Sequence, residues 1–200
     1  MKALLSVGIY RDIQVCQDSW EAQKPPDCHV DLFYQRWFPE VEERPYDRIR
    51  AERIRAAEIA MAGGYDYLFE VSDDILLPLD ALEVLIASRF PVISGLYRLH
   101  AENSGGEHLM CRIMNQDGPQ DSNDRYITLD DIDPKDPIIR ASQFDMGVLL
   151  LNKEALRLLA PAVGTEEEFI SRMMYLKWAP LAHTGVRCGH VKENGKIVEV

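Results

Sequence analysis

Two neighbouring aspartates are the first residues in this sequence whose type and spacing suggest chemistry. Asp73 and Asp74 come directly after the largely apolar segment DYLFEV at residues 66–71 and Ser72. Adjacent carboxylates repel each other unless a cation or an arginine lies between them, and carboxylate oxygens are good ligands for hard divalent ions. Alternatively, both residues merely open a turn that leads to Pro78. Their position alone leaves both interpretations open.

A run of three carboxylates lies later in the chain, at Glu166, Glu167 and Glu168. Thr165 and Glu168 have the spacing of a helix capping box, and acidic residues at a helix N-terminus also complement its dipole. A structural role is therefore sufficient for this run, and Glu168 is best explained as part of the cap.

His190 is the histidine with the best case for a ligand role, because it follows Gly189, which would let the backbone approach a bound group. Imidazole suits Mn²⁺ as well as zinc. A second acidic pair, Asp131 and Asp133, lies in an irregular acidic stretch before Pro134, and we expect it to take no part in a site.

The segments that must position these residues alternate between strand and helix patterns. Strand patterns occur at residues 3–10, 66–71 and 91–97, and a further strand is expected within 29–38. A helix is predicted over residues 48–62, ended by Gly63 and Gly64. Another is predicted over 81–89, after a capping box of Asp80 and Glu83 and a hydrophobic staple of Leu79 and Val84. This order predicts an α/β fold with a mostly parallel sheet flanked by helices, whose strands end at a ligand-binding edge.

The second half of the sequence is less regular. Residues 100–137 are predicted to form a long loop with a short hairpin near 108–114, and loops of this size are often functional. A strand at 144–152 and helices at 153–160 and 166–178 follow. We expect one domain over 1–200, made of a first half at 1–99, the irregular loop at 100–137 and a second half at 138–200.

Composition narrows the classes of function. A formal charge of -11 and a pI near 4.9 disfavour binding to nucleic acid or to an anionic membrane. No stretch is apolar enough for a transmembrane segment or a full signal peptide, so a cytoplasmic location is expected. The four cysteines form no CxxC pair and are expected to be free thiols; they are Cys16, Cys28, Cys111 and Cys188.

The order of these motifs resembles the nucleotide-sugar half of GT-A fold glycosyltransferases, a Rossmann-like fold, and particularly the family 2-like group. Those enzymes carry an arginine on a helix, a strand ending in Asp-x-Asp, a proline before a helix, and a strand ending in Ser-Gly. The matching positions here are Arg53, Ser72-Asp73-Asp74, Pro78 and Ser94-Gly95. Residues 140–159 and 165–191 look like the acceptor-side segments of the same family, with Gly147 at its small position and His190 at its terminal histidine.

The resemblance implies a site. It places Mn²⁺ or Mg²⁺ on Asp74 and His190 and a general base near Glu166 or Glu167, with Asp145 as a further acceptor contact. One departure is that Ser72 stands where the family has its first acidic residue. Contacts with the nucleotide-sugar are expected from Gly8, Ile9, Tyr10, Arg11, Arg53, Ser72 and Asp73.

The implied function is metal-dependent transfer of a sugar from a UDP- or GDP-linked donor to an acceptor that is a glycan, a protein or a small molecule. A divalent ion would neutralise the charge that grows on the leaving diphosphate. A non-catalytic nucleotide-sugar or partner-binding module of the same fold is the alternative, which Ser72 keeps open. A nucleotidyltransferase would be expected to show a Gly-rich phosphate loop after the first strand, and VGIYRDIQ at residues 7–14 is not one.

Overall fold

A seven-stranded sheet forms the centre of the computed structural model, which describes residues 1–36, 45–101, 106–114, 124–144, 146–160 and 166–200. The strand order is β10-β13-β5-β12-β3-β1-β2. All strands except β12 and β10 run in the same direction, so the prediction of a mostly parallel α/β sheet is confirmed. The bounds are β1 Lys2–Ile9, β2 His29–Arg36, β3 Tyr67–Ser72, β5 Val92–Leu96, β10 Ile138–Arg140, β12 Val148–Asn152 and β13 Leu181–Arg187.

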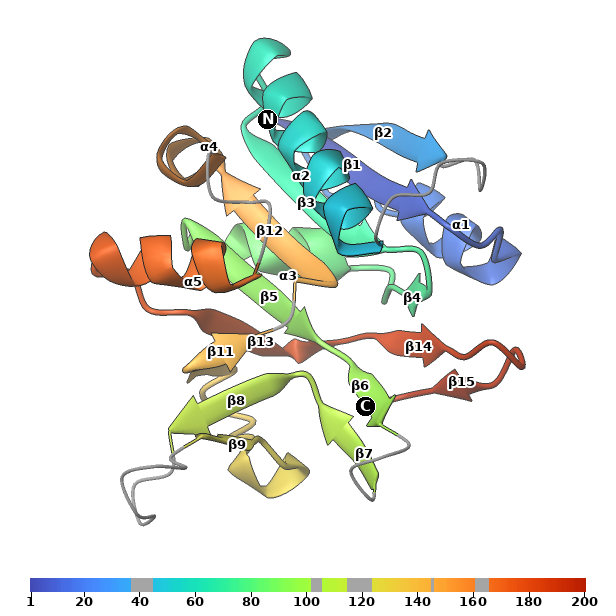
Figure 1. The fold of residues 1–200 in the computed structure, drawn as a ribbon, viewed down its shortest axis with the longest axis vertical. Helices are drawn as coiled ribbons and strands as arrows, with labels where there is room; N and C mark the ends of the chain where they lie inside the picture. The colour runs from blue at the N-terminus through green and yellow to red at the C-terminus, as the bar shows by residue number, and fades with distance from the viewer. Residues whose placement is uncertain (37–44, 102–105, 115–123, 145, 161–165) are drawn as a thin grey trace.

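Helices cover both faces of this sheet (Figure 1). On one face, α2 (Pro45–Ala62), α4 (Lys153–Leu159) and α5 (Glu166–Tyr175) enclose a core that includes Leu4, Leu68 and Phe169. On the other face, α1 (Gln14–Glu21) and α3 (Ala81–Ala87) enclose a core that includes Trp20 and Phe69. Successive residues of β1 and β3 therefore alternate between two apolar cores, as expected for a sheet buried on both faces.

Three smaller sheets complete the structure. The strands β11 (Gln143–Phe144), β8 (Cys111–Met114) and β9 (Asp124–Tyr126) form one, and β6 (Arg98–Ala101) pairs with β7 (Gly106–Leu109) in another. The third joins β15 (Ile197–Val198), β14 (Gly189–Val191) and β4 (Ile75–Leu76). Figure 1 shows the first two beyond the β5 and β13 side of the large sheet. The prediction of an irregular loop at 100–137 is therefore wrong where the structure describes it, since these residues carry β7, β8, β9 and the short helix Leu129–Asp131.

Helix α1, which the sequence did not predict, anchors the chain that follows Asp74. The indole Nε1 of Trp20 donates to the Ile75 carbonyl at 2.9 Å, and the Ser19 hydroxyl accepts from the Leu77 amide at 3.1 Å. The Gln23 side chain just after the helix donates to the Pro78 carbonyl at 2.8 Å and accepts from the Leu82 amide at 3.0 Å. These bonds satisfy backbone groups of a buried turn.

Gln23 also explains why the expected capping box of α3 is wrong. Asp80 makes no side-chain cap bond, and in the first turn the Gln23 amide oxygen accepts from the Leu82 amide instead. Leu79 is 77% exposed, so the expected hydrophobic staple is absent. The predicted end of α2 is confirmed, since the helix ends at Ala62 and Gly64 adopts a φ of 66°.

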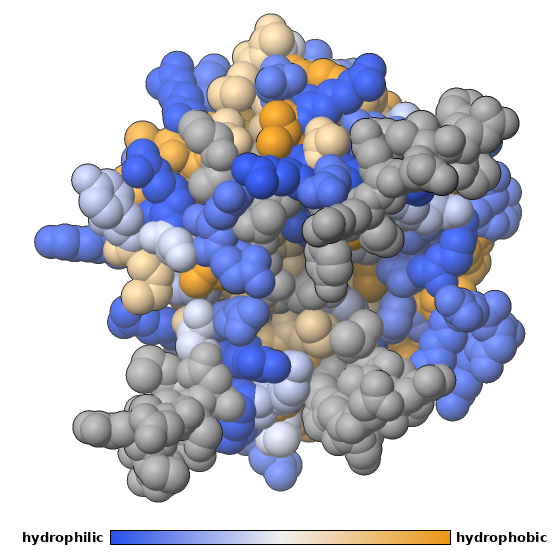
Figure 2. Space-filling model, viewed as in Figure 1, coloured by the Kyte–Doolittle hydropathy of each residue, from blue (hydrophilic) through white to orange (hydrophobic). Residues whose placement is uncertain are grey.

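Figure 2 shows that hydrophilic residues predominate on the face where α2 lies in front, with hydrophobic ones scattered among them. Within the described residues, no helix is long and apolar enough to cross a membrane. The four cysteines lie in described parts of the chain and are free thiols, as predicted.

Candidate functional site

A cavity of about 220 Å³ lies between α2 and the carboxyl ends of β1 and β3. Ser6 and Gly8 of β1 pair in register with Glu70 and Ser72 of β3, and all of these residues face α2. Leu4 of β1 and Leu68 of β3 fill the space under α2 at the start of these strands. Farther along the same face, at every second residue, small or polar side chains take their place and leave a cavity. Its remaining lining comes from Tyr10, Gln35, Ile49, Glu52, Arg53, Val71, Asp73, Asp74 and Met146.

Asp73 fastens the end of β3 to the chain that follows β1. One of its carboxylate oxygens accepts from the backbone amides of Tyr10 at 2.9 Å and Arg11 at 2.7 Å, and the residue is 5% exposed. Burial raises the pKa of Asp73, although these two amide donors act in the opposite direction. Asp73 therefore has a positioning role, which holds Tyr10 and Arg11 at the edge of the cavity.

Asp74 is the centre of a small charged cluster. Its Oδ2 accepts from Nη2 of Arg11 at 2.6 Å and lies 3.0 Å from Nε2 of His190. Burial alone would raise the pKa of Asp74, but His190 and Arg11 together hold it below its ordinary value. An arginine therefore lies beside the two adjacent carboxylates, as their mutual repulsion requires.

His190 reaches this cluster because β14 pairs with β4, the strand that begins right after Asp74. His190 is opposite Ile75, and the Val191 amide donates to the Asp74 carbonyl at 2.8 Å. A Cβ atom on Gly189 would lie 3.0–3.3 Å from side-chain atoms of Ile197 and Leu76. The glycine thus permits close strand pairing, and its expected approach to a ligand stays a prediction.

Both ring nitrogens of His190 face oxygen acceptors. Nδ1 lies 2.9 Å from the Arg98 carbonyl, and Nε2 faces the Asp74 carboxylate. A histidine can donate from both nitrogens only when it is protonated. The hydrogen bond to Asp74 accordingly raises the pKa of His190, against the effect of burial.

The donor atoms of Asp74 and His190 fit a divalent ion as a pair. The separation of 3.0 Å between Oδ2 and Nε2 equals that of two neighbouring ligands in an octahedron with bonds of about 2.1 Å. Within the described residues there is no group of three or more His, Cys, Asp or Glu side chains arranged to hold a metal. An ion at this position would therefore need further oxygen ligands from its substrate or from water.

Two buried glutamates in the cavity were not anticipated from the sequence. Glu52 of α2 is 6% exposed and Glu70 of β3 is 5% exposed. The Glu70 carboxylate has Nε of Arg53 3.9 Å from its Oε2. A Cβ atom at Gly8 would lie 2.0 Å from Oε2 of Glu52, so this glycine makes room for the glutamate. For Glu70, the signal in the sequence is its position as an acidic residue inside the apolar run YLFEV.

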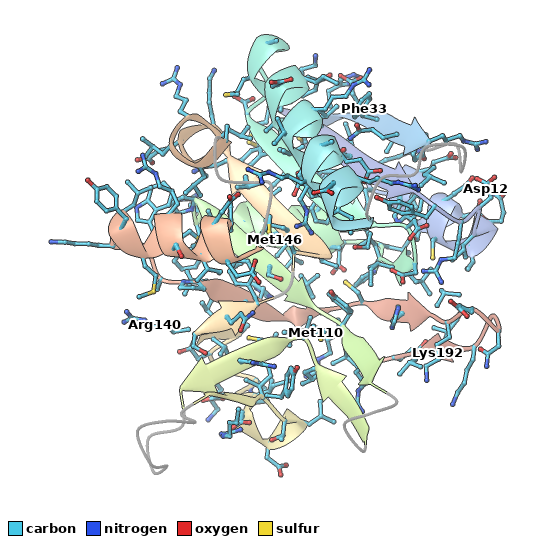
Figure 3. All side chains as sticks on the ribbon, viewed as in Figure 1. Asp12, Phe33, Met110, Arg140, Met146 and Lys192 are labelled. Atoms are coloured by element: carbon cyan, nitrogen blue, oxygen red, sulfur yellow. The ribbon has the colours of Figure 1, made fainter. Side chains whose placement is uncertain are left out.

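The other predicted site residues are distributed as follows. Arg53 and Tyr10 line the cavity, whereas the Ile9 side chain is buried in the core on the opposite face of the sheet. Ser72 lies at the end of β3, and its amide donates to the Gly147 carbonyl at 2.9 Å. Met146 lies between α2 and α5 (Figure 3), where its sulfur is 3.4 Å from Nη1 of Arg53.

The predicted catalytic acids are only partly described. Glu167 is exposed in the first turn of α5. Asp145 and the side chain of Glu166 lie outside the described residues. The neighbouring Glu168 is 3.4 Å from Arg50 of α2, so the start of α5 lies beside the helix that lines the cavity.

Comparison with solved structures gives information on the fold of this chain. The crystal structure of A197 from STIV matches 100% of this chain and 94% of its own, with 13% sequence identity and a TM-score of 0.55. This chain shares the fold of A197. Two lower-scoring matches are a glycosyltransferase involved in glycosylation of the major capsid of PBCV-1 (10% identity, 86% and 73% of the two chains, TM-score 0.44) and CMP:2-keto-3-deoxy-manno-octonic acid synthetase with CTP (11%, 92% and 89%, 0.45). No protein-family model matches the sequence, and no curated protein matches it.

The buried Glu70 predicts a pH-dependent stability. Burial raises its pKa to about 7 from an ordinary value of 4.5, with Arg53 acting in the opposite direction. The folded state holds this proton more tightly than the unfolded chain does. Proton binding by Glu70 therefore contributes its full free energy to folding below about pH 4, and this contribution is lost as the pH rises to about 7. We therefore compare the free energy of unfolding of Glu70→Gln with that of wild type at two pH values. The difference should grow by roughly 2–3 kcal/mol in favour of the variant from pH 5 to pH 8.

Urea unfolding of both proteins at the two pH values measures this gain. Glu58→Gln, which removes an exposed carboxylate from α2, is the matched control. Its stability relative to wild type should differ between pH 5 and pH 8 by no more than a few tenths of a kcal/mol. A Glu70→Gln variant whose stability relative to wild type is the same at pH 5 and pH 8 would show that Glu70 is ionised in the folded protein throughout.

Proposed function

We propose that this protein is a metal-dependent glycosyltransferase that uses a nucleotide-diphosphate sugar. The observation that carries the proposal is the cluster of Asp74, His190 and Arg11 at the carboxyl end of β3, beside a polar cavity. Ligands of open α/β sheets bind at this edge. The A197 match supports the fold and carries no information on the substrate.

Asp74 and His190 are the residues that would hold Mn²⁺ or Mg²⁺. When bound there, the ion supplies positive charge that stabilises a leaving diphosphate without proton transfer. His190 is held by the contact of its Nδ1 with the Arg98 carbonyl, which leaves Nε2 facing the Asp74 carboxylate. Binding of the ion would replace the hydrogen between Nε2 of His190 and Asp74, so it would release a proton.

Arg11 provides a second positive charge at the same place. Its guanidinium lies 2.6 Å from Asp74 and can donate to phosphate oxygens, which match its planar arrangement of N–H groups. Asp73 holds the Arg11 backbone amide at 2.7 Å and so keeps this residue at the end of β1. The donor diphosphate would thus lie beside Asp74, with the nucleoside toward Tyr10 and Arg53 in the cavity.

Deprotonation of the acceptor hydroxyl is assigned to the acidic segment at the start of α5. Glu166 and Glu167 remain the candidates for the general base, and Asp145 is the candidate acceptor contact. The exposed position of Glu167, next to the Glu168 that pairs with Arg50 of α2, is compatible with an acceptor that arrives from solvent.

The second candidate function is a non-catalytic nucleotide-sugar or partner-binding module of the same fold. Ser72 favours it, because a hydroxyl replaces the first acidic residue of the motif and leaves two metal-ligand side chains among the described residues. Release of free sugar from UDP- or GDP-linked donors with Mn²⁺ would distinguish the enzyme from the module, which binds donors without cleaving them.

A thermal melt with nucleoside diphosphates tests the proposal. A ligand specific for the folded state stabilises it by about 2.7 kcal/mol at a hundredfold excess over its Kd. For a chain of this size that corresponds to a rise of roughly 5–10 °C in Tm. We expect one of UDP, GDP and dTDP to produce this rise with Mn²⁺ or Mg²⁺, and far less with chelator. The proposal fails if no nucleotide shifts the melt with either metal.

A further inference from the structure

Glu70 is a buried carboxylate that the described part of the protein leaves without hydrogen bonds. Neither of its side-chain oxygens has a hydrogen-bond partner or reaches solvent, and the same is true of Oε1 of Glu52. Its ion-pair contact among the described residues is with Nε of Arg53, which lies 3.9 Å from Oε2. Leaving a buried acceptor unpaired is costly, so such a group inside a cavity indicates that a ligand supplies the missing donors.

The polar groups that line this cavity define which ligand fits. Glu52 and Glu70 offer acceptors, and Arg53 offers donors. One N–H of the Gln35 side-chain amide is already committed, because Nε2 donates to the Glu52 carbonyl at 2.9 Å. The complement of this arrangement is a flat group with two adjacent N–H donors and one neighbouring acceptor.

Among the nucleobases, guanine presents that edge. Its N1–H and 2-amino groups are adjacent donors, and O6 next to them is an acceptor. Uracil places a single N–H between two carbonyl oxygens, which would face the carboxylates with like partial charge. Cytosine and adenine each offer one amino group beside a ring nitrogen that is an acceptor.

We propose that the cavity binds the base of a guanine nucleotide, with Glu70 accepting from the 2-amino group, Glu52 accepting from N1–H and Arg53 donating to O6. This inference rests on the proposed function, because it assigns the nucleotide of the donor. The cavity volume of about 220 Å³ is below the range of about 300–1,000 Å³ for drug-sized ligands, so it suits a base rather than a whole nucleotide. Asp73 and Asp74 line the same cavity, which places the diphosphate at its edge.

Calorimetric titration of the wild-type protein with GDP, IDP and UDP in the presence of Mn²⁺ tests the inference. IDP lacks only the 2-amino group of GDP. A hydrogen bond to a charged acceptor contributes enough that its loss weakens binding by about tenfold or more. We expect GDP to bind at least about tenfold more tightly than either IDP or UDP.

Glu70→Gln tests the residue itself, since it keeps the shape and replaces an acceptor oxygen with a donor amide. The variant should lose most of the preference for GDP over IDP, whereas Glu58→Gln on the exposed face of α2 should retain it. Tight binding of UDP, or equal binding of GDP and IDP, would overturn the guanine assignment while leaving the proposed function standing. Retention of the full GDP preference in Glu70→Gln would overturn it as well, and binding of no nucleotide would overturn both.

Discussion

Replacing Asp74 by asparagine is expected to lower the affinity for a nucleoside diphosphate with Mn²⁺ by at least about a hundredfold. Loss of groups that only support a metal ligand already costs about 10–100-fold, and Asp74 is the proposed ligand itself. The change also removes the charge to which Arg11 and His190 are bonded. Asparagine keeps the shape of the side chain, so the melt without ligand should remain cooperative. Calorimetry with the nucleotide that stabilises the wild type measures the loss.

Asp131→Asn is the matched control for this prediction. Asp131 is also a carboxylate bound by an arginine, since its Oδ2 accepts from Nη1 of Arg125 at 2.7 Å, and it belongs to the second acidic pair at 131–133. This change should leave nucleotide and metal binding unaltered. An Asp74→Asn protein that binds as tightly as wild type, or an Asp131→Asn protein that does not bind, would show that the acidic pair was wrongly chosen.

Trp20→Ala is expected to lower the free energy of unfolding by about 3–5 kcal/mol, the usual cost of deleting a large buried aromatic side chain. Trp20 is fully buried in the core formed with α3, and its indole donates to the Ile75 carbonyl at 2.9 Å. The change therefore creates a void and leaves a buried carbonyl unpaired next to Asp74. Urea unfolding at constant pH measures the effect.

Two further variants separate the contributions to this cost. Trp20→Phe retains most of the apolar volume and removes the donor, and should cost about 1–3 kcal/mol. Val15→Ala on the same helix, at a residue 42% exposed, should change stability by no more than about 0.5 kcal/mol. A Trp20→Ala protein as stable as Val15→Ala would show that α1 does not hold the turn after β3.

The central strands and α2 could be predicted because their signals are local. β1, β3 and β5 are short apolar runs bounded by polar or turn-forming residues, and α2 ends at a pair of glycines. The turn at Asp73 and Asp74 follows from the position of β3. The proximity of His190 to Asp74 followed from the resemblance in motif order, because no local pattern links residues 116 positions apart.

Other features could not be predicted because they depend on tertiary contacts. α1 begins at Gln14 after the apolar N-cap Ile13, and its stability comes from packing and from the bonds of Trp20 and Ser19 to residues 75–77. The short strands β6 to β9 form by pairing with partners and carry little periodicity of their own. The cap of α3 comes from Gln23, a residue 59 positions from Leu82.

Glu70 was not among the site residues predicted from the sequence. The sequence shows it plainly within β3, but an acidic residue in a strand is usually placed at a solvated face. Only the structure shows that both faces of β3 are covered and that the carboxylate lies under α2. The polar cavity was therefore missed, although its position beside the aspartate turn follows from the register of β1 and β3.

The pairing of β14 with β4 also bears on the order in which the molecule assembles. Gly8, Glu52 and Glu70 lie within residues 2–72, a continuous stretch whose strands β1 and β3 are direct neighbours. His190 meets Asp74 only after a loop of more than a hundred residues has closed, and contacts of such long sequence separation form late and slowly. Most of the residues that line the pocket under α2 can therefore meet early, Met146 being the exception, whereas the charged cluster at its edge needs the C-terminal strand. We therefore expect a partly folded intermediate to hold these cavity residues near one another and to lack the contact between Asp74 and His190.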